Sequence, residues 1–344
     1  MTIHHFYSTD YEQKTGGWIY NRHLISWLDR HMGGVTELTV PVCFPAPDAV
    51  VLAEIDAMLG RIEPGAVLVM DHIYGCMLLP ILQDRPFKLV LIYHHSMNEE
   101  RGEGDATASR NSAEQSALEL ADAIVATSDE SRAYITGHYG ITADKIVIAK
   151  PGNDPAPQSP IHDGGPWHIL SVGAVIPRKR YAFLVEALAK LERSDWSLTI
   201  AGNTERYPDD VTALQNLIKT RGLTRHITIA GELPENALDA LWAKTHLYIA
   251  SSLYEGYGMA ISEAICRGVP VITTPSGAVA SWAGDAATLI DADDAGEMAR
   301  QIAAVMADPL AYGEAREKAV RFAAGLPSWE ANMARVGEGL RRLV

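Results

Sequence analysis

The sequence predicts an α/β protein made of two doubly wound, Rossmann-like domains. Short apolar segments alternate with helix-like segments along most of the 344 residues, as is typical of parallel sheets covered by helices. The alternation is interrupted from Pro151 to Pro166 by a segment with five prolines and three glycines, which indicates a linker. We therefore predict domains at residues 1–152 and 167–327, joined by residues 153–166.

The first domain begins with an apolar strand and an amphipathic helix that stops at a glycine pair, Gly33-Gly34. The predicted strands are Ile3–Tyr7, Val35–Val42, Ala66–Met70, Lys88–His95, Ala123–Thr127 and Lys145–Ala149. The predicted helices are Trp18–His31, Asp48–Leu59, Ile73–Leu82, Thr107–Leu120 and Asp129–His138. The polar segment Ser96–Asp105 is predicted to be a loop that acts as a lid or contacts an acceptor.

The second domain repeats the same alternation. Its predicted strands are Trp167–Val172, Ser197–Ala201, His226–Ala230, His246–Ala250, Val269–Thr273 and Ala287–Asp291. Its predicted helices are Tyr181–Glu192, Pro208–Arg221, Pro234–Lys244, Met259–Arg267 and Ala295–Ala307, with further helix after Pro309 that includes Ser328–Leu343.

Composition excludes several classes of function. A formal charge of −14 and a pI of about 5.3 argue against nucleic acid as a partner. No apolar run approaches the ~20 residues that span a bilayer, and the first residues lack the pattern of a signal peptide. Cys43, Cys76 and Cys266 are scattered, as expected for buried thiols of a reducing compartment and not for disulfides or a zinc site. These features predict a soluble cytoplasmic protein.

The most informative segment is Ser251–Pro270, which follows a predicted buried strand. Glu255 is placed in the loop after that strand, and Glu263 about one turn into the next helix. Gly256 and Gly258 allow close approach of a ligand, and the first N–H groups of the helix favour an anion. Two structural carboxylates in a buried glycine turn are the alternative. Because ligands of open α/β sheets bind at the carboxyl ends of strands, we favour a site for a sugar joined to a phosphate.

A second glycine turn follows the first strand of the second domain. Val172-Gly173-Ala174 leads to three consecutive cations, Arg178-Lys179-Arg180. Such cations can bind a diphosphate through charge-assisted hydrogen bonds, or they can be the charged surface of a helix start. Because cations are unfavourable near a helix N-terminus, the pattern indicates a neighbouring anion.

Two features of the first domain are candidates with open alternatives. The Gly16-Gly17 pair precedes the first helix and is either a flexible turn or a close backbone approach to a phosphate or sugar. His94-His95 ends a predicted strand and either binds a sugar or phosphate or caps the next loop.

Other known motifs are missing or isolated. No P-loop, dinucleotide fingerprint, H-E-x-x-H, G-x-S-x-G or paired C-x-x-C occurs. Asp291-Ala292-Asp293 has the D-x-D form of a metal site, but it lies far in sequence from Glu255 and no other metal-like cluster supports it. We therefore predict neither a metal ion nor a cofactor.

The segment from Glu255 to Glu263, continuing to Pro270-Val271-Ile272, resembles the E-x7-E signature of retaining glycosyltransferases with the GT-B fold, glycosyltransferase family four. The resemblance is strongest from about Ser171 to Asp308. It implies an N-terminal acceptor-binding domain that faces a C-terminal nucleotide-sugar domain across a cleft, with a last helix, about 328–344, that packs back on the first domain.

The resemblance also implies roles for individual residues. Glu255 would face the donor sugar, Glu263 the ribose, and Arg178 and Lys179 the leaving diphosphate; His94 best matches a histidine of the cleft. Glu255, His94, Lys179 and Arg178 are thus the implied catalytic residues. The other implied donor-binding residues are Gly16, Gly17, Gly173, Gly202, Asn203, Glu232, Leu233, Gly256, Tyr257, Gly258, Met259 and Ala260. One departure is Ala174, where many members have Arg; Arg178 in Pro177-Arg178-Lys179 is expected to supply the missing charge, as in a bacterial polysaccharide subgroup.

The implied activity is transfer of a hexosyl group, with retention and without metal, from GDP-mannose or a UDP-hexose to a hydroxyl acceptor. The acceptor is expected to be a saccharide, glycolipid or small molecule of cell-surface glycan synthesis, used in the cytoplasm or at the inner face of the membrane. The alternatives are a nucleotide-sugar epimerase, a sugar phosphorylase and a non-enzymatic two-lobed binding protein.

Overall fold

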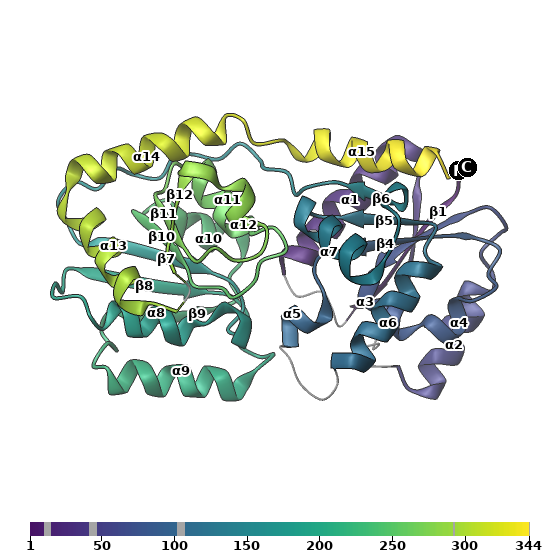
Figure 1. The fold of residues 1–344 in the computed structure, drawn as a ribbon, viewed down its shortest axis with the longest axis horizontal. Helices are drawn as coiled ribbons and strands as arrows, with labels where there is room; N and C mark the ends of the chain where they lie inside the picture. The colour runs from purple at the N-terminus through teal and green to yellow at the C-terminus, as the bar shows by residue number, and fades with distance from the viewer. Residues whose placement is uncertain (10–14, 41–46, 102–106, 292, 344) are drawn as a thin grey trace. The chain divides into compact units, whose positions relative to one another are not determined.

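The computed structural model describes residues 1–9, 15–40, 47–101, 107–291 and 293–343. The chain forms two compact units, of which unit 1 comprises Met1–Gly152 with Pro327–Val344 and unit 2 comprises Asn153–Leu326. Each unit contains a six-stranded sheet whose paired strands are all parallel, with helices along it (Figure 1). The prediction of two doubly wound sheets is therefore confirmed.

The sheet of unit 1 has the order β2-β1-β3-β4-β5-β6. Its strands are β1 (Ile3–Ser8), β2 (Val35–Val40), β3 (Val67–Asp71), β4 (Lys88–Tyr93), β5 (Ala123–Ala126) and β6 (Ile146–Ile148). Its helices are α1 (Gly16–Met32), α2 (Ala49–Leu59), α3 (His72–Met77), α4 (Leu79–Leu82), α5 (Met97–Arg101), α6 (Thr107–Leu120), α7 (Asp129–Tyr139) and α15 (Trp329–Arg341). Strand β4 is a continuous apolar run because both of its faces are buried.

Helix α15 returns the chain to unit 1 and packs on α1. A Cβ atom on Gly337 would lie 2.4 Å from a ring carbon of Trp27, so only glycine permits this close approach of the two helices. Ser328 caps α15 by accepting a hydrogen bond from Ala331 N.

The sheet of unit 2 has the order β12-β11-β10-β7-β8-β9. Its strands are β7 (Trp167–Val172), β8 (Trp196–Ala201), β9 (Ile227–Gly231), β10 (Leu247–Ala250), β11 (Val271–Thr273) and β12 (Ala287–Leu289). Its helices are α8 (Tyr181–Leu188), α9 (Pro208–Thr220), α10 (Glu235–Trp242), α11 (Met259–Cys266), α12 (Val279–Trp282), α13 (Ala295–Ala307) and α14 (Pro309–Ala323). Ile169 packs in one apolar cluster and Leu170 in another, so both faces of β7 are covered.

Counted along the chain within unit 2, the strand order is 6-5-4-1-2-3. This is the Rossmann order, in which the direction of the crossovers reverses between the first and fourth strands. Here those strands are β7 and β10, which pair directly. The loops that follow β7 and β10 therefore diverge at the edge where such sheets bind ligands.

Several sequence predictions need correction or lie outside the described residues. The helix predicted at Ile73–Leu82 is two helices, because Leu78 leaves helical geometry (φ −99°, ψ 6°) just before α4, whose first turn contains Pro80. The loop predicted at Ser96–Asp105 begins with the short helix α5, while residues 102–106 lie outside the described residues. Cys43, Ala292 and residues 10–14, which precede the Gly16-Gly17 pair, also lie outside them.

Candidate active site

The turn after β7 is shaped by two glycines. Val172 leads into Gly173, where a Cβ atom would lie only 2.7 Å from Lys179 Cε. At Gly202, which follows β8, a Cβ atom would lie 2.1 Å from the Gly173 carbonyl oxygen. The two turns therefore pack backbone against backbone, and the stem of Lys179 lies directly on Gly173.

Glu255, in the loop after β10, is the centre of an ion cluster. Its side chain is only 11% exposed, and its Oε1 lies 2.6 Å from Lys179 Nζ while its Oε2 lies 3.4 Å from Arg178 Nη1. Ser252 Oγ donates a 2.6 Å hydrogen bond to Oε1. Burial alone would raise the pKa of this carboxyl, but Lys179 and Arg178 outweigh burial and lower it to about 2. Glu255 is therefore ionised and held by its neighbours at neutral pH.

The structure brings Glu255, to which the resemblance gave the donor sugar, into contact with Arg178 and Lys179, to which it gave the leaving diphosphate. The anion expected beside Arg178 and Lys179 is present in the chain itself, since both cations contact Glu255. Arg178 also donates a 2.7 Å hydrogen bond to the Tyr254 carbonyl oxygen, which fixes the β10 loop to the β7 loop. Arg180 differs from its two neighbours, because it contacts the exposed Asp293 at 3.5 Å.

The loop then enters α11 through Gly258, which has a left-handed backbone (φ +91°). No side chain in the described part of the chain caps this helix, and its first N–H groups, including those of Met259 and Ala260, have no partner within the helix. Tyr257 is fixed behind them by stacking on Trp282 at 5.0 Å and by the Trp282 Nε1 hydrogen bond to its carbonyl oxygen. An uncapped N-terminus with these free donors favours an anion.

Glu263 lies on the second turn of α11 and is half-buried. Its carboxyl makes no hydrogen bond or ion pair with the residues that the structure describes. Burial raises its pKa to about 7, with Asp239 and Asp154 adding to the effect and Arg267 opposing it. Such a carboxyl carries a proton part of the time at neutral pH and can both donate to and accept from a hydroxyl group.

The remaining candidates of unit 2 lie at the ends of β8 and β9. Asn203, just after Gly202, accepts hydrogen bonds from Glu205 N and Arg206 N, and its backbone oxygen accepts one from Val175 N. Its amide lies 3.4 Å from Glu232 Oε2. Leu233, next in sequence, packs against the apolar cluster that includes Leu170. These residues thus adjoin the Gly173 turn.

In unit 1 the structure separates the two adjacent histidines. A Cβ atom on Gly17 would lie 3.2 Å from His94 Cδ2, so Gly17 and the His94 ring are neighbours, whereas His95 Nδ1 lies 3.1 Å from the Ser96 carbonyl oxygen. The exposed Gly16 begins α1, which is capped by Thr15. Burial lowers the pKa of His94 to about 4 despite the nearby carboxylate of Asp71, so its ring is neutral at neutral pH.

Sequence reasoning missed the groups that hold His94. Its Nε2 lies 3.0 Å from Asn21 Oδ1 and 3.4 Å from Asp71 Oδ2. Asp71 ends β3, so a carboxylate directly after an apolar strand was an available signal. Asn21 gave no signal, because nothing in the local sequence of α1 shows that its side chain lies beside His94.

A buried charge cluster lies behind Asp71. His72 is 3.1 Å from Asp71 Oδ1 and 3.1 Å from Glu114 Oε1. Although burial opposes protonation, the two carboxylates raise the pKa of His72 to about 9. Glu114 is completely buried and accepts further hydrogen bonds from Ser96 Oγ (2.7 Å), Tyr139 Oη (2.6 Å) and Met97 N (2.8 Å).

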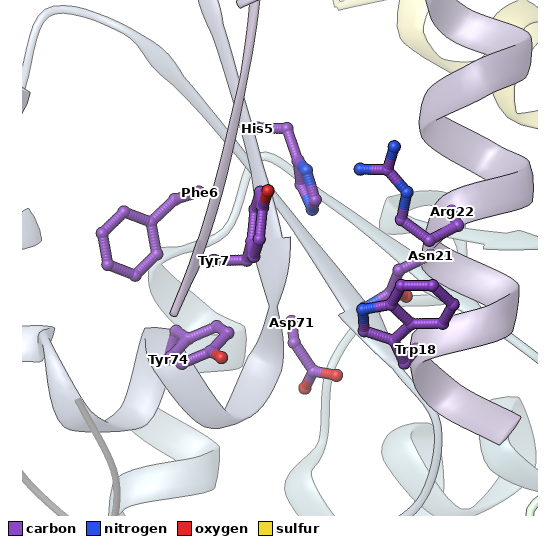
Figure 2. Close-up of a pocket in the computed structure, with 8 residues that line it drawn as sticks. All are labelled: His5, Phe6, Tyr7, Trp18, Asn21, Arg22, Asp71 and Tyr74. Carbon is purple, nitrogen blue, oxygen red and sulfur yellow. The ribbon is translucent and has the colours of Figure 1, made fainter. Parts of the chain in front are cut away.

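A small pocket, with an accessible volume of about 20 Å³, adjoins Asp71 in unit 1. Figure 2 shows the imidazole of His5 extending from β1 toward α1, with Trp18 and Arg22 opposite it and Asp71 below. The lining residues come from β1, α1, the end of β3 and α3: His5, Phe6, Tyr7, Trp18, Asn21, Arg22, Asp71 and Tyr74.

The two doubly wound units match the GT-B class of glycosyltransferase folds, as comparison with solved structures shows. Sucrose-phosphate synthase from Thermosynechococcus elongatus superposes with a TM-score of 0.83 at 19% identity, covering 100% of this chain and 99% of that chain. Anabaena Alr3699/HepE, solved in complex with UDP and glucose, has a TM-score of 0.80 at 17% identity, with 99% and 100% coverage.

The model of the family "Glycosyl transferases group 1" matches residues 153–324, and that of "Glycosyltransferase Family 4" matches residues 40–156. The chain therefore belongs to the group 1 glycosyltransferases. Escherichia coli O-antigen chain mannosyltransferase B is 29% identical over 191 residues, which are 52% of this chain and 49% of that protein. The chain spans about half the length of the curated relatives it matches. None of the helices in the described part of the chain is long and apolar enough to cross a membrane.

Proposed function

We propose that the protein transfers a hexosyl group, with retention of configuration, from a nucleotide-diphosphate sugar to a hydroxyl acceptor. The observation that carries the proposal is the convergence of Lys179, Arg178 and Glu255 where the crossovers of unit 2 reverse direction, together with the uncapped start of α11. Unit 2 binds the donor in this proposal, and unit 1 binds the acceptor. Likeness to a UDP-bound structure and to a mannosyltransferase supports a UDP-hexose or GDP-mannose donor.

The proposed reaction needs the protein to stabilise negative charge on the leaving diphosphate and does not need a nucleophilic side chain. The bond between the anomeric carbon and the diphosphate oxygen breaks as the acceptor oxygen bonds to that carbon from the same face. The acceptor proton passes to an oxygen of the departing diphosphate. Lys179, Arg178 and the N–H groups of Met259 and Ala260 stabilise the charge that accumulates on this leaving group, so we propose that no metal ion is required.

Glu255 orients the donor and is not itself the nucleophile in this mechanism. Its two oxygens contact Lys179, Arg178 and Ser252, and the low pKa that results makes it a weak base. Donor hydroxyls would join this cluster, while Glu263 would bind the ribose hydroxyls. His94 beside Gly17 would contact the transferred sugar or its phosphate.

The test uses the full chain with UDP-, GDP-, ADP- and dTDP-hexoses, each with and without EDTA. We expect one nucleotide to stabilise the protein against heat, with its α-linked sugar transferred to an α-linked product, as judged by NMR of the anomeric proton. EDTA should leave the rate unchanged. An inverted product, or release of an epimerised nucleotide-sugar without any acceptor, would overturn the proposal.

A further inference from the structure

Unit 2 contains a pocket at the edge of its sheet opposite the Gly173 turn. The pocket has an accessible volume of about 210 Å³, and it is lined by the first halves of β7 and β8, the start of β9 and the end of α10. His168 of β7 precedes Gly173 by five residues, so at ~3.3 Å per residue the pocket lies about 16 Å from that turn along the strand. A cavity of about 150 Å³ can hold benzene, so this pocket has room for a six-membered ring with a further group.

The floor of the pocket carries hydroxyl groups. Leu198 of β8 and Ile227 of β9 pack in the apolar cluster on one face of the sheet. The residues that alternate with them, and therefore point to the other face, are Ser197, Thr199 and Thr228, all of which line the pocket. Thr199 and Thr228 are direct partners in the β8–β9 register. Their hydroxyl groups form no hydrogen bond with the residues that the structure describes, so they are available to a ligand.

A cation lies toward each end of the pocket. The exposed Arg225 just precedes β9, and the exposed Lys244 lies between α10 and β10. In the order β10-β7-β8-β9 these positions are three strand intervals apart, about 14 Å at ~4.8 Å per interval. Within the described part of the chain neither cation forms an ion pair, and no aspartate or glutamate lines the pocket. In a chain with a formal charge of −14, two unpaired cations around a pocket without carboxylates favour an anionic ligand.

His168 adds a neutral hydrogen-bonding group on the floor. Its Nδ1 lies 3.0 Å from Ser197 Oγ, while its Nε2 bonds to none of the residues in the described ranges. Burial lowers the pKa of His168, and the nearby Lys244 and His162 lower it further, so the ring is neutral at neutral pH. When Ser197 donates to Nδ1, the Nε2–H group is left as a donor that points to no protein acceptor.

We infer that this pocket binds the phosphate monoester of a small polyol or sugar, at a site separate from the proposed donor site. Arg225 binds the phosphoryl oxygens through paired N–H donors, and Lys244 binds them as a compact positive charge. Thr199, Thr228 and His168 bind the hydroxyl groups of the ligand. The inference does not depend on the proposed function, because the pocket shares no residue with the Gly173 turn or the start of α11.

The experiment measures ligand binding to the full chain by calorimetry at low ionic strength. The charged probes are inorganic phosphate, glycerol 3-phosphate and glucose 6-phosphate, and the neutral probes are glycerol and glucose. We expect glycerol 3-phosphate or glucose 6-phosphate to bind with a Kd of about 1 mM or lower. The same compound should bind at least about tenfold more tightly than its neutral counterpart and more tightly than inorganic phosphate. Added salt should weaken the binding, because the two cations are exposed.

Variants then assign the binding to the pocket. Arg225→Gln and Lys244→Met should each weaken it about tenfold, and both should fold because these side chains are exposed. Thr199→Val keeps the shape of its side chain and should weaken binding of the polyol phosphate more than that of inorganic phosphate. Lys190→Met, at another exposed cation of unit 2, is the matched control. Lys179→Met removes a cation of the proposed donor site and should leave this binding in place.

A second arm distinguishes a soluble ligand from a lipid with the same chemistry. Flotation of the full chain is compared between phosphatidylcholine vesicles with and without phosphatidylinositol 4-phosphate. Flotation only with the phosphorylated lipid, lost in Arg225→Gln, would identify the phosphate monoester as a lipid head group.

Three results would overturn the inference: no phosphorylated probe or lipid binds; neutral probes or inorganic phosphate bind as well as the polyol phosphates; or binding is unchanged in both Arg225→Gln and Lys244→Met. Loss of binding in Lys179→Met alone would have the same meaning, because the phosphate would then occupy the Gly173 turn. Nucleotide binding and sugar transfer are measured separately, so a failure of the proposed function is distinguishable from a failure of this inference.

Discussion

Replacing Lys179 by Met tests the ion cluster most directly. The change keeps the length of the side chain over Gly173 but removes the charge that lies 2.6 Å from Glu255. Glu255 would then retain Arg178 at 3.4 Å and the Ser252 hydroxyl. We expect both lower stability of unit 2 and slower transfer.

The expected size follows from the pKa of Glu255. At about 1.4 kcal/mol for each pH unit, lowering the pKa from 4.5 to about 2 corresponds to ~3 kcal/mol in favour of the ionised folded state. Lys179 is the stronger of the two cations that overcome the burial penalty, so losing it should cost about 2 kcal/mol. Because the folded pKa is depressed, this stability is present above pH 4.5 and is lost as the pH falls toward 2.

The assay is a double-mutant cycle with Lys179→Met, Glu255→Gln and the pair, read by hydrogen exchange of amides in β7 and β10. We prefer Glu255→Gln to alanine because alanine would leave two half-buried cations without a counter-charge. The coupling energy at pH 7 should be about 1–3 kcal/mol and should shrink below pH 4. Lys219→Met, on the exposed side of α9, is the control and should change little.

A coupling energy below about 0.5 kcal/mol at pH 7 would refute the argument, because Lys179 would then not share its charge with Glu255. In the same variant kcat should fall by a factor of about 10²–10³ if Lys179 also stabilises the leaving diphosphate. Normal kcat with a large coupling energy would make Lys179 a structural residue only.

Three further predictions concern other positions. Gly258→Ala places a Cβ atom 2.8 Å from Val279 at a residue with φ +91°. Calorimetry should show weaker binding of UDP or GDP, and denaturation should show that the free energy of unfolding falls by about 1–3 kcal/mol. Unchanged binding would exclude the start of α11 as an anion site. Gly17→Ala should leave the melting temperature unchanged or raise it, since alanine favours helix over glycine by up to ~1 kcal/mol. Turnover should nevertheless fall about tenfold, because the new Cβ atom would displace the His94 ring. Full activity would show that the contact between Gly17 and His94 is not part of the site. The pKa of His72 is raised from 6.5 to about 9, so its contribution to stability is complete below pH 6.5 and is lost as the pH rises through 9. The protection factors of β3 amides, corrected for the intrinsic pH dependence of hydrogen exchange, should fall over this range, and His72→Gln should abolish that fall.

The strands were predictable because parallel strands buried on both faces are short, uninterrupted apolar runs, as in Val67–Met70 and Lys88–Tyr93. The positions of Glu255 and Lys179 at strand ends were predictable for the same reason. Their contact was not, because it depends on β10 pairing with β7, and strand order is not written in local sequence. The His72–Glu114 pair was hidden for a related reason: a glutamate on the inner face of α6 gains its meaning from a partner 42 residues away.

The return of the chain to unit 1 has a consequence for biosynthesis and for engineering. The chain leaves unit 1 after Gly152 and re-enters it beside the same point, since a Cβ atom on Gly152 would lie 2.0 Å from Trp329 N. Unit 2 is therefore an insertion within unit 1. During translation the surface of α1 around Trp27 stays exposed until residues 327–344, which include α15, have been synthesised. Unit 2 is therefore expected to finish folding before unit 1. Because Gly152 and Trp329 are so close, a short linker from Gly152 to Ser328 could replace unit 2 and leave unit 1 as one continuous chain. Residues 153–326 could likewise be exchanged as one block for the corresponding unit of a relative.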